Sequence, residues 1–178
     1  MAKIKNWNSC TPAEQIERYE HVVEVLKSMT PHERREHWNM SLWGVATECG
    51  TVHCAAGKCG LTPWFIKRGL KLKPTPLEKL IWKDHEGNTI IPNALGDSEE
   101  IGGAGSFEGG DNAVERFFGA VGTDSIFTND ELRPVSEVIN EVKLYIKHLK
   151  ALPKLVKKFR EDNGHAPERW DIPFELDQ

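Results

Sequence analysis

Three of the four cysteines lie within one stretch of eleven residues, which also contains a histidine. Thiolates are nucleophiles and soft metal ligands, and an imidazole can serve as a base or as a ligand. Thr51 can cap a helix that begins at Val52. Cys54 would then lie in the first turn, where unpaired amides and the helix dipole favour the thiolate. The stretch therefore has a catalytic and a metal-binding interpretation.

The catalytic interpretation is a thiol hydrolase or transferase that uses Cys54 as its nucleophile. The base would have to be His85, His148 or His165, and nothing in the spacing brings any of them to the cysteine. Cysteine is also one of the most frequently buried residue types and packs as a small hydrophobic side chain. We favour this structural interpretation, and we therefore expect no catalytic residue.

The metal-binding interpretation takes Cys49, His53, Cys54 and Cys59 as zinc ligands. Structural zinc sites usually draw on pairs of ligands spaced two to four residues apart. Cys54 and Cys59 are five residues apart, so on a helix their side chains point about 140° away from each other. We therefore expect neither a metal nor another cofactor.

Basic residues near the C-terminus form the best-ordered polar pattern of the chain. Seven basic residues and no acid lie between 143 and 160; subtracting them from the net charge of −4 leaves −11 on the remainder. Five lysines step by four and three residues, which places them along one side of a helix: Lys143, Lys147, Lys150, Lys154 and Lys157. Such a row can bind an anionic small molecule, a nucleic acid or an acidic protein.

Tryptophans flank the cysteine stretch on both sides and suggest a second candidate binding site. Trp43 precedes it and Trp64 follows it, with Lys67 and Arg68 close behind. Buried rings of this kind belong to the core more often than to a ligand site. If a pocket exists, we expect it between the cysteine helix and these rings, with the two cations at its mouth.

A repeated dipeptide predicts where helices begin. Threonine can cap a first turn, and proline at the first helical position lacks an N–H that would be unpaired anyway. Thr-Pro occurs four times, at residues 11–12, 30–31, 62–63 and 75–76. Glutamate completes a capping box after three of these, at Glu14, Glu33 and Glu78. We predict helix starts near residues 12, 31, 63 and 76.

Apolar spacing extends these predictions along the chain. Helices are expected over 12–29, over 52–59 with a narrow face of small residues, over 63–70 and from 135 onward. Gly60 would stop the second of these, and Pro153 would bend or break the last, which continues to Gly164. Residues 80–92 fit either a continued helix or a β-hairpin around 81–91, and we favour the hairpin.

Two further segments, one rich in glycine and one with alternating apolar residues, are predicted to lack helices. Residues 96–110 hold six glycines with acids between them and are expected to form a loop. Residues 165–178 alternate apolar side chains with polar residues or proline, as an extended tail packed on the body would. The fold class is thus mainly α, with a single α-rich domain over 1–164 and an extended tail over 165–178.

Composition sets the broad class. A chain of 178 residues with 39% hydrophobic residues can bury a core and resembles a globular protein. Its apolar runs are too short to cross a bilayer, and no leader-like run follows Met1. We therefore expect a soluble cytoplasmic protein with free thiols. Its oligomeric state stays open.

The cysteine stretch also carries a family resemblance. Trp43, Cys49-Gly50-Thr51, Cys54 and Ala56-Gly57 resemble the Trp…Cys-Gly-Thr-x-x-Cys-x-Ala-Gly signature of small uncharacterised proteins of bacteria and their phages. The segment 113–119 and the final amphipathic helix are similar to elements that follow in such proteins. Lys58 departs from the pattern, since an aromatic residue is common there. The resemblance implies no chemistry, and it favours a phage or accessory-genome origin.

Taken together, these patterns predict a non-catalytic binding protein. It would recognise an anionic small molecule or a host macromolecule through the lysine row or the tryptophan-lined pocket. The alternatives are the thiol enzyme described above and a structural or assembly protein that uses the tryptophan-rich surface and the tail.

Overall fold

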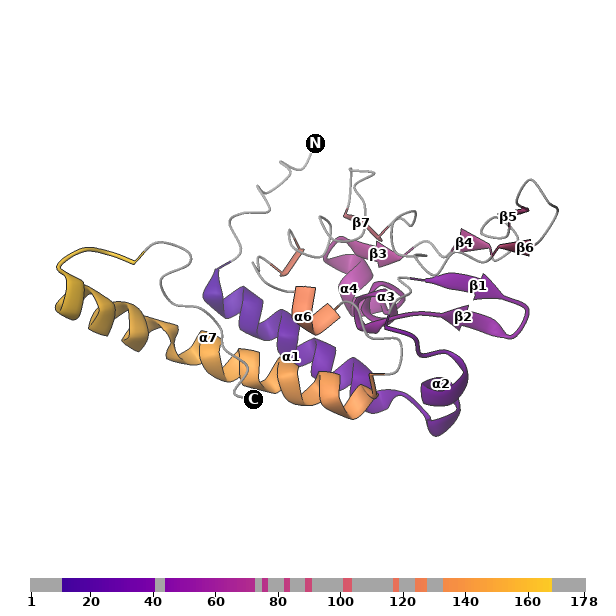
Figure 1. Cartoon of the computed structure of the whole chain (residues 1–178), viewed down its shortest axis with the longest axis horizontal. Coiled ribbons are helices and arrows are strands. Elements are labelled where there is room, and N and C mark those ends of the chain that lie inside the picture. The colour runs from indigo at the N-terminus through magenta and orange to yellow at the C-terminus, as the bar shows by residue number, and fades with distance from the viewer. Residues whose placement is uncertain are drawn as a thin grey trace.

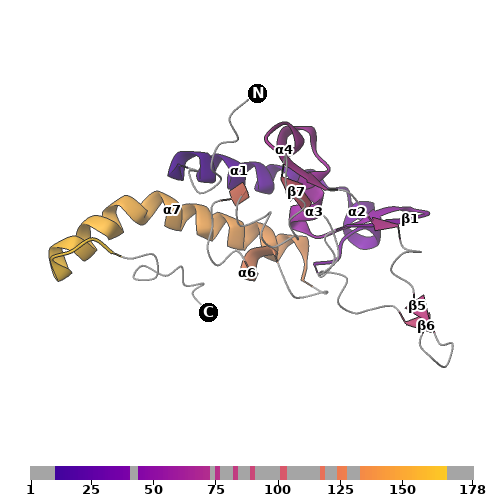
Figure 2. The ribbon, with the colours of Figure 1, turned by 90° about the horizontal axis from the view of Figure 1, so that it is seen from above.

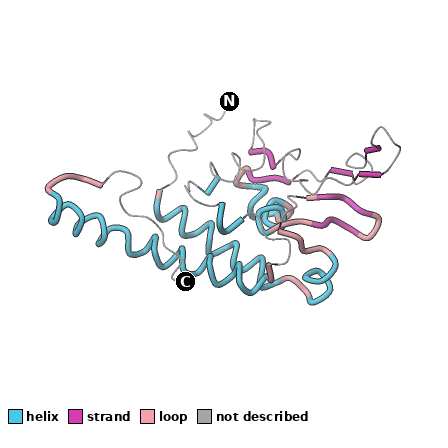
Figure 3. Tube along the Cα trace, in the orientation of Figure 1, coloured by secondary structure: helices cyan, strands magenta, loops and turns pink. Residues whose placement is uncertain are grey.

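The computed structural model describes residues 11–40, 44–72, 75–76, 82–83, 89–90, 101–103, 117–118, 124–127 and 133–167. Most of them are helical, which confirms the mainly α class (Figures 1 and 3). The helices are α1 (Pro12–Ser28), α2 (Pro31–Glu36), α3 (Ala55–Gly60), α4 (Pro63–Lys67), α6 (Asp124–Phe127) and α7 (Val135–Asn163). The strands are β1 (Val45–Thr47), β2 (Gly50–Val52), β3 (Leu70–Leu72), β4 (Thr75–Pro76), β5 (Trp82–Lys83), β6 (Thr89–Ile90) and β7 (Ile101–Gly103).

Two of the predicted capping boxes are confirmed in full. At the start of α1, the Thr11 amide donates to Glu14 Oε2 at 2.8 Å, and the Glu14 amide donates to Thr11 Oγ1 at 3.2 Å. Thr30 and Glu33 repeat the pattern at the start of α2, with the same two distances. These bonds satisfy amides that the first helical turn leaves unpaired.

The third Thr-Pro start is confirmed with a different bond. Pro63 opens α4, yet Thr62 makes no side-chain cap. Its hydroxyl instead donates to the Cys59 carbonyl at 2.8 Å, which ties α4 to the end of α3. The helix ends at Lys67 rather than at residue 70, because Gly69 has φ +100° and β3 begins directly after it.

The fourth predicted start, near residue 76, is wrong. Thr75 and Pro76 form β4, which pairs in parallel with Val45 and Ala46 of β1. The sheet order is β2-β1-β4, so β4 lies at an edge. Proline is tolerated in an edge strand because its missing N–H need not donate to a neighbouring strand.

The predicted cap at Thr51 is also wrong. Thr51 lies in β2, opposite Ala46 of β1 in an antiparallel pair. The helix α3 begins three residues later than predicted, at Ala55, and its cap is Cys54. The Cys54 sulfur accepts the Gly57 amide at 3.4 Å. The strand pairing of β2 outweighs the local capping preference of threonine.

The last residue of α3 lies very close to a strand. α3 ends at Gly60 as predicted. A Cβ atom added to Gly60 would lie 2.7 Å from the backbone nitrogen of Leu72, so β3 passes where only glycine leaves room. This contact fixes α3 against β3.

Two further segments contain strands. The hairpin prediction is confirmed, since Trp82 pairs with Ile90 and Lys83 with Thr89. The loop prediction for residues 96–110 is wrong at residues 101–103, which form β7 and pair antiparallel with Leu70–Leu72 of β3. Backbone groups need hydrogen-bond partners, and those of residues 101–103 find them in β3. The glycine-rich sequence alone does not reveal this pairing.

The longest helix packs along α1 in the opposite direction (Figures 1 and 2). Fully or nearly buried side chains line the contact, among them Tyr19, Val22 and Leu26 of α1 and Val138 and Val142 of α7. Pro153 does not break α7, which runs unbroken to Asn163 and is capped by Gly164 with φ +75°. One proline removes one backbone bond, and the turns on either side hold the helix.

Candidate functional site

The five predicted lysines form one continuous surface on α7. We call Lys143, Lys147, Lys150, Lys154 and Lys157 the lysine face; all five are exposed. At 100° per residue they fall within about 80° of arc, and from first to last they span about 21 Å of helix. The buried stripe of α7 faces α1, so the lysines point to solvent.

Acidic neighbours neutralise this face only in part. Lys150 Nζ lies 2.8 Å from Glu20 Oε1 on α1, with both side chains about half exposed. Lys157 Nζ lies 3.7 Å from Glu161 Oε1, one turn further along α7. Among the described residues, Lys143, Lys147 and Lys154 have no acidic partner. Exposed pairs of this kind contribute about 0–1 kcal/mol, so a ligand can displace them.

The second half of the lysine face lies on a projecting part of the molecule. In Figures 1 and 2 the C-terminal end of α7 extends past the first turn of α1. Lys154, Lys157, Lys158 and Arg160 belong to this end, and all are exposed. A projecting cationic helix is accessible to a large partner as well as to a small ion.

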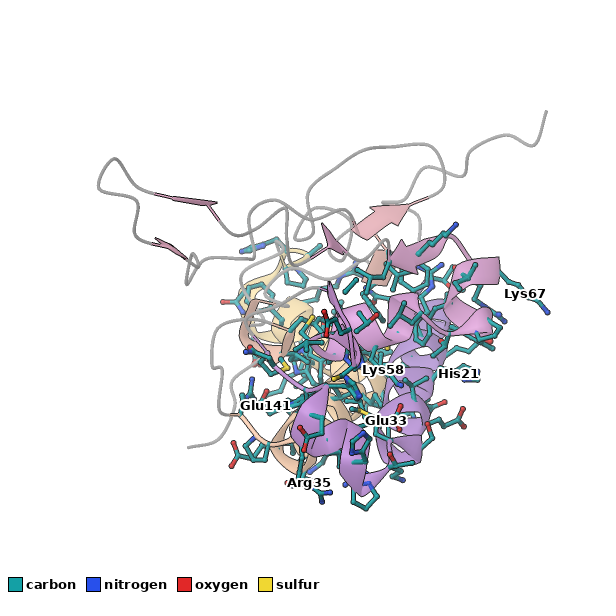
Figure 4. The ribbon with its side chains drawn as sticks, turned by 90° about the vertical axis from the view of Figure 1, so that its right-hand side faces the viewer. His21, Glu33, Arg35, Lys58, Lys67 and Glu141 are labelled. Atoms are coloured by element: carbon teal, nitrogen blue, oxygen red, sulfur yellow. The ribbon has the colours of Figure 1, made fainter. Side chains whose placement is uncertain are left out.

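The tryptophan-lined site is only partly within the described residues. Trp43 lies outside them. The half-buried ring of Trp64 has the Arg68 guanidinium 3.6 Å from its centroid and the His21 ring 3.8 Å away. Arg68 also pairs with Glu17 at 3.3 Å. Lys67 is exposed and extends away from the body, near the side on which His21 lies (Figure 4).

This arrangement covers Trp64 instead of leaving its ring open. Arg68 and His21 occupy the ring surface that a planar ligand would need, and Glu17 neutralises the arginine. The predicted pair of cations is therefore divided, with Arg68 packed and Lys67 free in solvent. We regard this cluster as packing between α1 and α4, and the lysine face as the stronger site.

The cysteines are separated by burial. Cys49 is exposed in the turn between β1 and β2, whereas Cys54 and Cys59 are 1% and 0% exposed. Burial raises the pKa of the Cys59 thiol well above its ordinary value. Among the described residues, no three histidine, cysteine or acidic side chains are placed to hold a metal ion. The set of Cys49, His53, Cys54 and Cys59 is thus not brought together as a metal site.

The three candidate bases cannot be assigned to Cys54. The ring of His165 packs against Phe159 at the far end of α7. His85 lies outside the described residues. His148 is on α7, where its ring stacks with Tyr145 at 6.3 Å, and partial burial lowers its pKa. A sulfur that is 1% exposed also offers no approach to a substrate. The burial of Cys54 agrees with the interpretation that it packs as a small hydrophobic side chain.

Sequence reasoning missed a buried polar group next to the cysteines. His53 is 2% exposed, and its Nδ1 has no hydrogen-bond partner among the described residues. Burial, and secondarily the charge of Lys58, lower the pKa of His53 to about 4. The ring is therefore neutral at neutral pH. His53 follows β2 directly and forms an isolated β-bridge with Trp38. No local sequence pattern predicts this pairing.

An ion pair lies beside this histidine. Lys58 Nζ approaches Glu33 Oε1 to 2.6 Å, joining α3 to α2, and the two side chains point toward each other in Figure 4. The hydrogen bond from Lys58 is the largest of the causes that lower the pKa of Glu33 to about 2. Lys58 thus has a structural partner on α2.

No known protein family, no curated protein and no solved structure matches the chain. Among the described residues, no helix is both long enough and apolar enough to cross a membrane. The lysine face is therefore the feature of the described structure from which a function can be inferred.

Proposed function

We propose that the protein is a non-catalytic binding protein that uses the lysine face of α7 to hold an anionic ligand or an anionic surface of a host macromolecule. The observation that carries the proposal is the row of five exposed lysines on the solvent side of the longest helix. Three of them lack an acidic partner among the described residues, so their charge is available to a ligand.

Two features of the cysteine stretch support binding over thiol catalysis. Cys54 is buried and serves as the cap of α3, which occupies its sulfur with the Gly57 amide. His53, its neighbour in sequence, is also buried. A reactive cysteine needs a partly exposed, electropositive setting. Among the described residues, the burial of Cys54 and His53 thus counts against the thiol enzyme.

The setting of the protein is part of the proposal. Cys49, Cys54 and Cys59 are free thiols, which supports a reducing compartment such as the cytoplasm. The resemblance around Cys49-Gly50-Thr51 supports an origin in a phage or in the accessory genome of a bacterium. Proteins of this kind would encounter host nucleic acids, nucleotides and acidic proteins.

A charge-reversal variant tests the lysine face. We expect Lys147→Glu, Lys150→Glu and Lys154→Glu together to reduce binding of an anionic probe at least tenfold. The probes are a 20-base-pair DNA duplex, ATP and a poly-glutamate peptide, each measured by fluorescence anisotropy or calorimetry at 50 and 200 mM salt. For the duplex, each lysine–phosphate contact contributes about 0.9 to the slope of log K against log salt.

A matched variant controls for net charge. Lys27→Glu, Arg35→Glu and Lys71→Glu change the total charge equally, at exposed positions outside α7. Binding should persist in this variant, and the three probes identify which class of anion the face prefers. Equal losses in both variants, or no binding of any probe by the native chain, would show that the lysines are only a solvated surface.

A further inference from the structure

Beyond the lysine face, α7 has an apolar surface near its C-terminal end. We call Leu152, Leu155, Val156 and Phe159 the distal face. At 100° per residue these four side chains fall within about 100° of arc, on the opposite side of the helix from the lysine face. Leu155 is 37% exposed, and the other three are half-buried.

The distal face continues the buried stripe of α7 past its partner helix. Leu152 still packs against the core, next to the end of the stripe at Leu149. Beyond it, α7 extends past the first turn of α1, as Figures 1 and 2 both show. The C-terminal end of α7, whose last turns hold Val156 and Phe159, therefore extends beyond α1. An apolar helix surface of this kind is stabilised by a partner.

Charges beside the distal face restrict the kind of partner. Lys158 and Arg160 flank it on opposite sides of the helix and are exposed. Long basic side chains can lie along apolar surface and still reach a carboxylate. A fitting partner thus combines apolar side chains with acidic ones.

The chain itself turns back at this point. Gly164 ends α7 in the left-handed conformation, with φ +75°, and residues 164–167 reverse direction (Figures 1 and 3). The ring of His165 then packs edge-on against Phe159, with the two centroids 5.5 Å apart. The first residue after the turn therefore already contacts the distal face.

The sequence that follows has the required chemistry. Trp170, Ile172, Phe174 and Leu176 alternate with other residues in the sequence, a pattern that would place all four on one side if the segment is extended. Four acids and one arginine give residues 168–178 a net charge of −3. Eleven extended residues span up to about 36 Å, whereas the distal face is about 10 Å long. The segment is therefore long enough to reach it.

We propose that residues 168–178 dock on the distal face of α7 and are its resident occupant. The apolar residues of the segment cover Leu155, Val156 and Phe159, and its carboxylates meet Lys158 and Arg160. The surface then accepts acidic segments with alternating apolar residues, and a host segment of that type competes with the tail. This surface is distinct from the lysine face, and it stands whether or not the lysines bind a ligand.

Hydrogen exchange measured by mass spectrometry tests the docking. Amides of residues 154–163 should exchange about tenfold faster in the chain truncated after residue 167 than in the full chain. Adding a synthetic peptide of residues 168–178 should restore protection. A peptide of the same composition, shuffled so that its apolar residues no longer alternate, should not. Equal exchange in the full and truncated chains overturns the proposal.

Two further measurements keep the result unambiguous. If truncation disturbs folding by circular dichroism, the full-length Trp170→Ser/Phe174→Ser variant replaces it and should show the same loss of protection. Exchange is also compared at 2 and 50 μM protein. Protection that rises with concentration would identify a second copy as the occupant, and restoration by the shuffled peptide would identify a non-specific surface; either result overturns the proposal.

Discussion

The buried imidazole of His53 couples the stability of this protein to pH. His53 is 2% exposed and unpartnered at Nδ1 among the described residues, and burial lowers its pKa to about 4. The unfolded chain, with an ordinary histidine pKa near 6.5, binds more protons between these two values. Stability therefore rises with pH across this window and is lost as the pH falls through it.

We expect the free energy of unfolding to fall by about 2 kcal/mol between pH 7 and pH 5 because His53 must be protonated on unfolding. The measurement is urea denaturation at both pH values. In His53→Gln, which cannot titrate, most of this difference should disappear.

His148→Gln is the matched control, since the pKa of His148 is lowered in the same direction by weaker burial. It should remove a smaller part of the difference. Glu33 does not interfere, because its stabilising contribution is lost only as the pH falls from 4.5 toward 2. An unchanged pH dependence in His53→Gln would mean that His53 is accessible to solvent protons in the native state.

At the scale of elements, threonines that all look like helix caps in the sequence are found in two settings, at helix starts and in strands. Thr11 and Thr30 cap helices through their side chains, whereas Thr51 lies in β2 and Thr75 in β4. The dipeptide and the capping box describe only the first turn. Whether the backbone instead pairs with β1 depends on residues that are distant in sequence, and pairing wins where a strand is available.

Valine substitutions separate these two roles. Thr30→Val should destabilise the protein by about 1 kcal/mol, because the cap of α2 loses its oxygen acceptor. Thr51→Val should change stability by less than about 0.5 kcal/mol, since a β-branched residue suits a strand. Thermal or urea unfolding measures both. If Thr51→Val destabilises the protein as much as Thr30→Val does, Thr51 caps a helix, as the sequence predicted.

At the scale of the whole molecule, an aromatic cluster holds distant segments together. The fully buried ring of Tyr19 on α1 lies 4.9 Å from Phe118, 6.1 Å from Phe127 of α6 and 4.8 Å from Tyr145 of α7. Phe65 of α4 joins it through contacts with Phe117 and Phe118. Five parts of the chain therefore share one core: α1, α4, residues 117–118, α6 and α7. The side of α7 that faces this core is packed against it.

Removing the central ring should be costly. Tyr19→Ala is expected to destabilise the protein by about 3–5 kcal/mol, through lost burial and the cavity left among these rings. Leu144→Ala, at a side chain that is 45% exposed on the same helix pair, should cost less than about 1 kcal/mol. Chemical denaturation compares the two. Similar values would mean that the rings do not form the centre of the core.

Much of the fold was predictable from sequence where the signal was local or strongly periodic. The long stripe of α7, its end at Gly164 and the starts of α1, α2 and α4 follow from spacing and capping. The hairpin at Trp82 and Ile90 was one of two options, and structure selected it. The errors at Thr51, Thr75 and Ile101 all concern strands whose partners lie elsewhere in the chain.

The features of the candidate site also fall into two groups, those predictable from local spacing and those set by contacts between distant segments. The order and exposure of the lysines follow from a period of 3.6 residues, because an apolar stripe on one side of a helix leaves the opposite side to solvent. The burial of Cys54, the neutral His53 and the cover of Arg68 over Trp64 were set by contacts between elements. Sequence by itself thus determined the starts of α1, α2 and α4, the extent of α7 and which side of α7 is polar. Only the tertiary structure decided which polar groups are hidden, because burial depends on neighbours that the chain brings together from far apart.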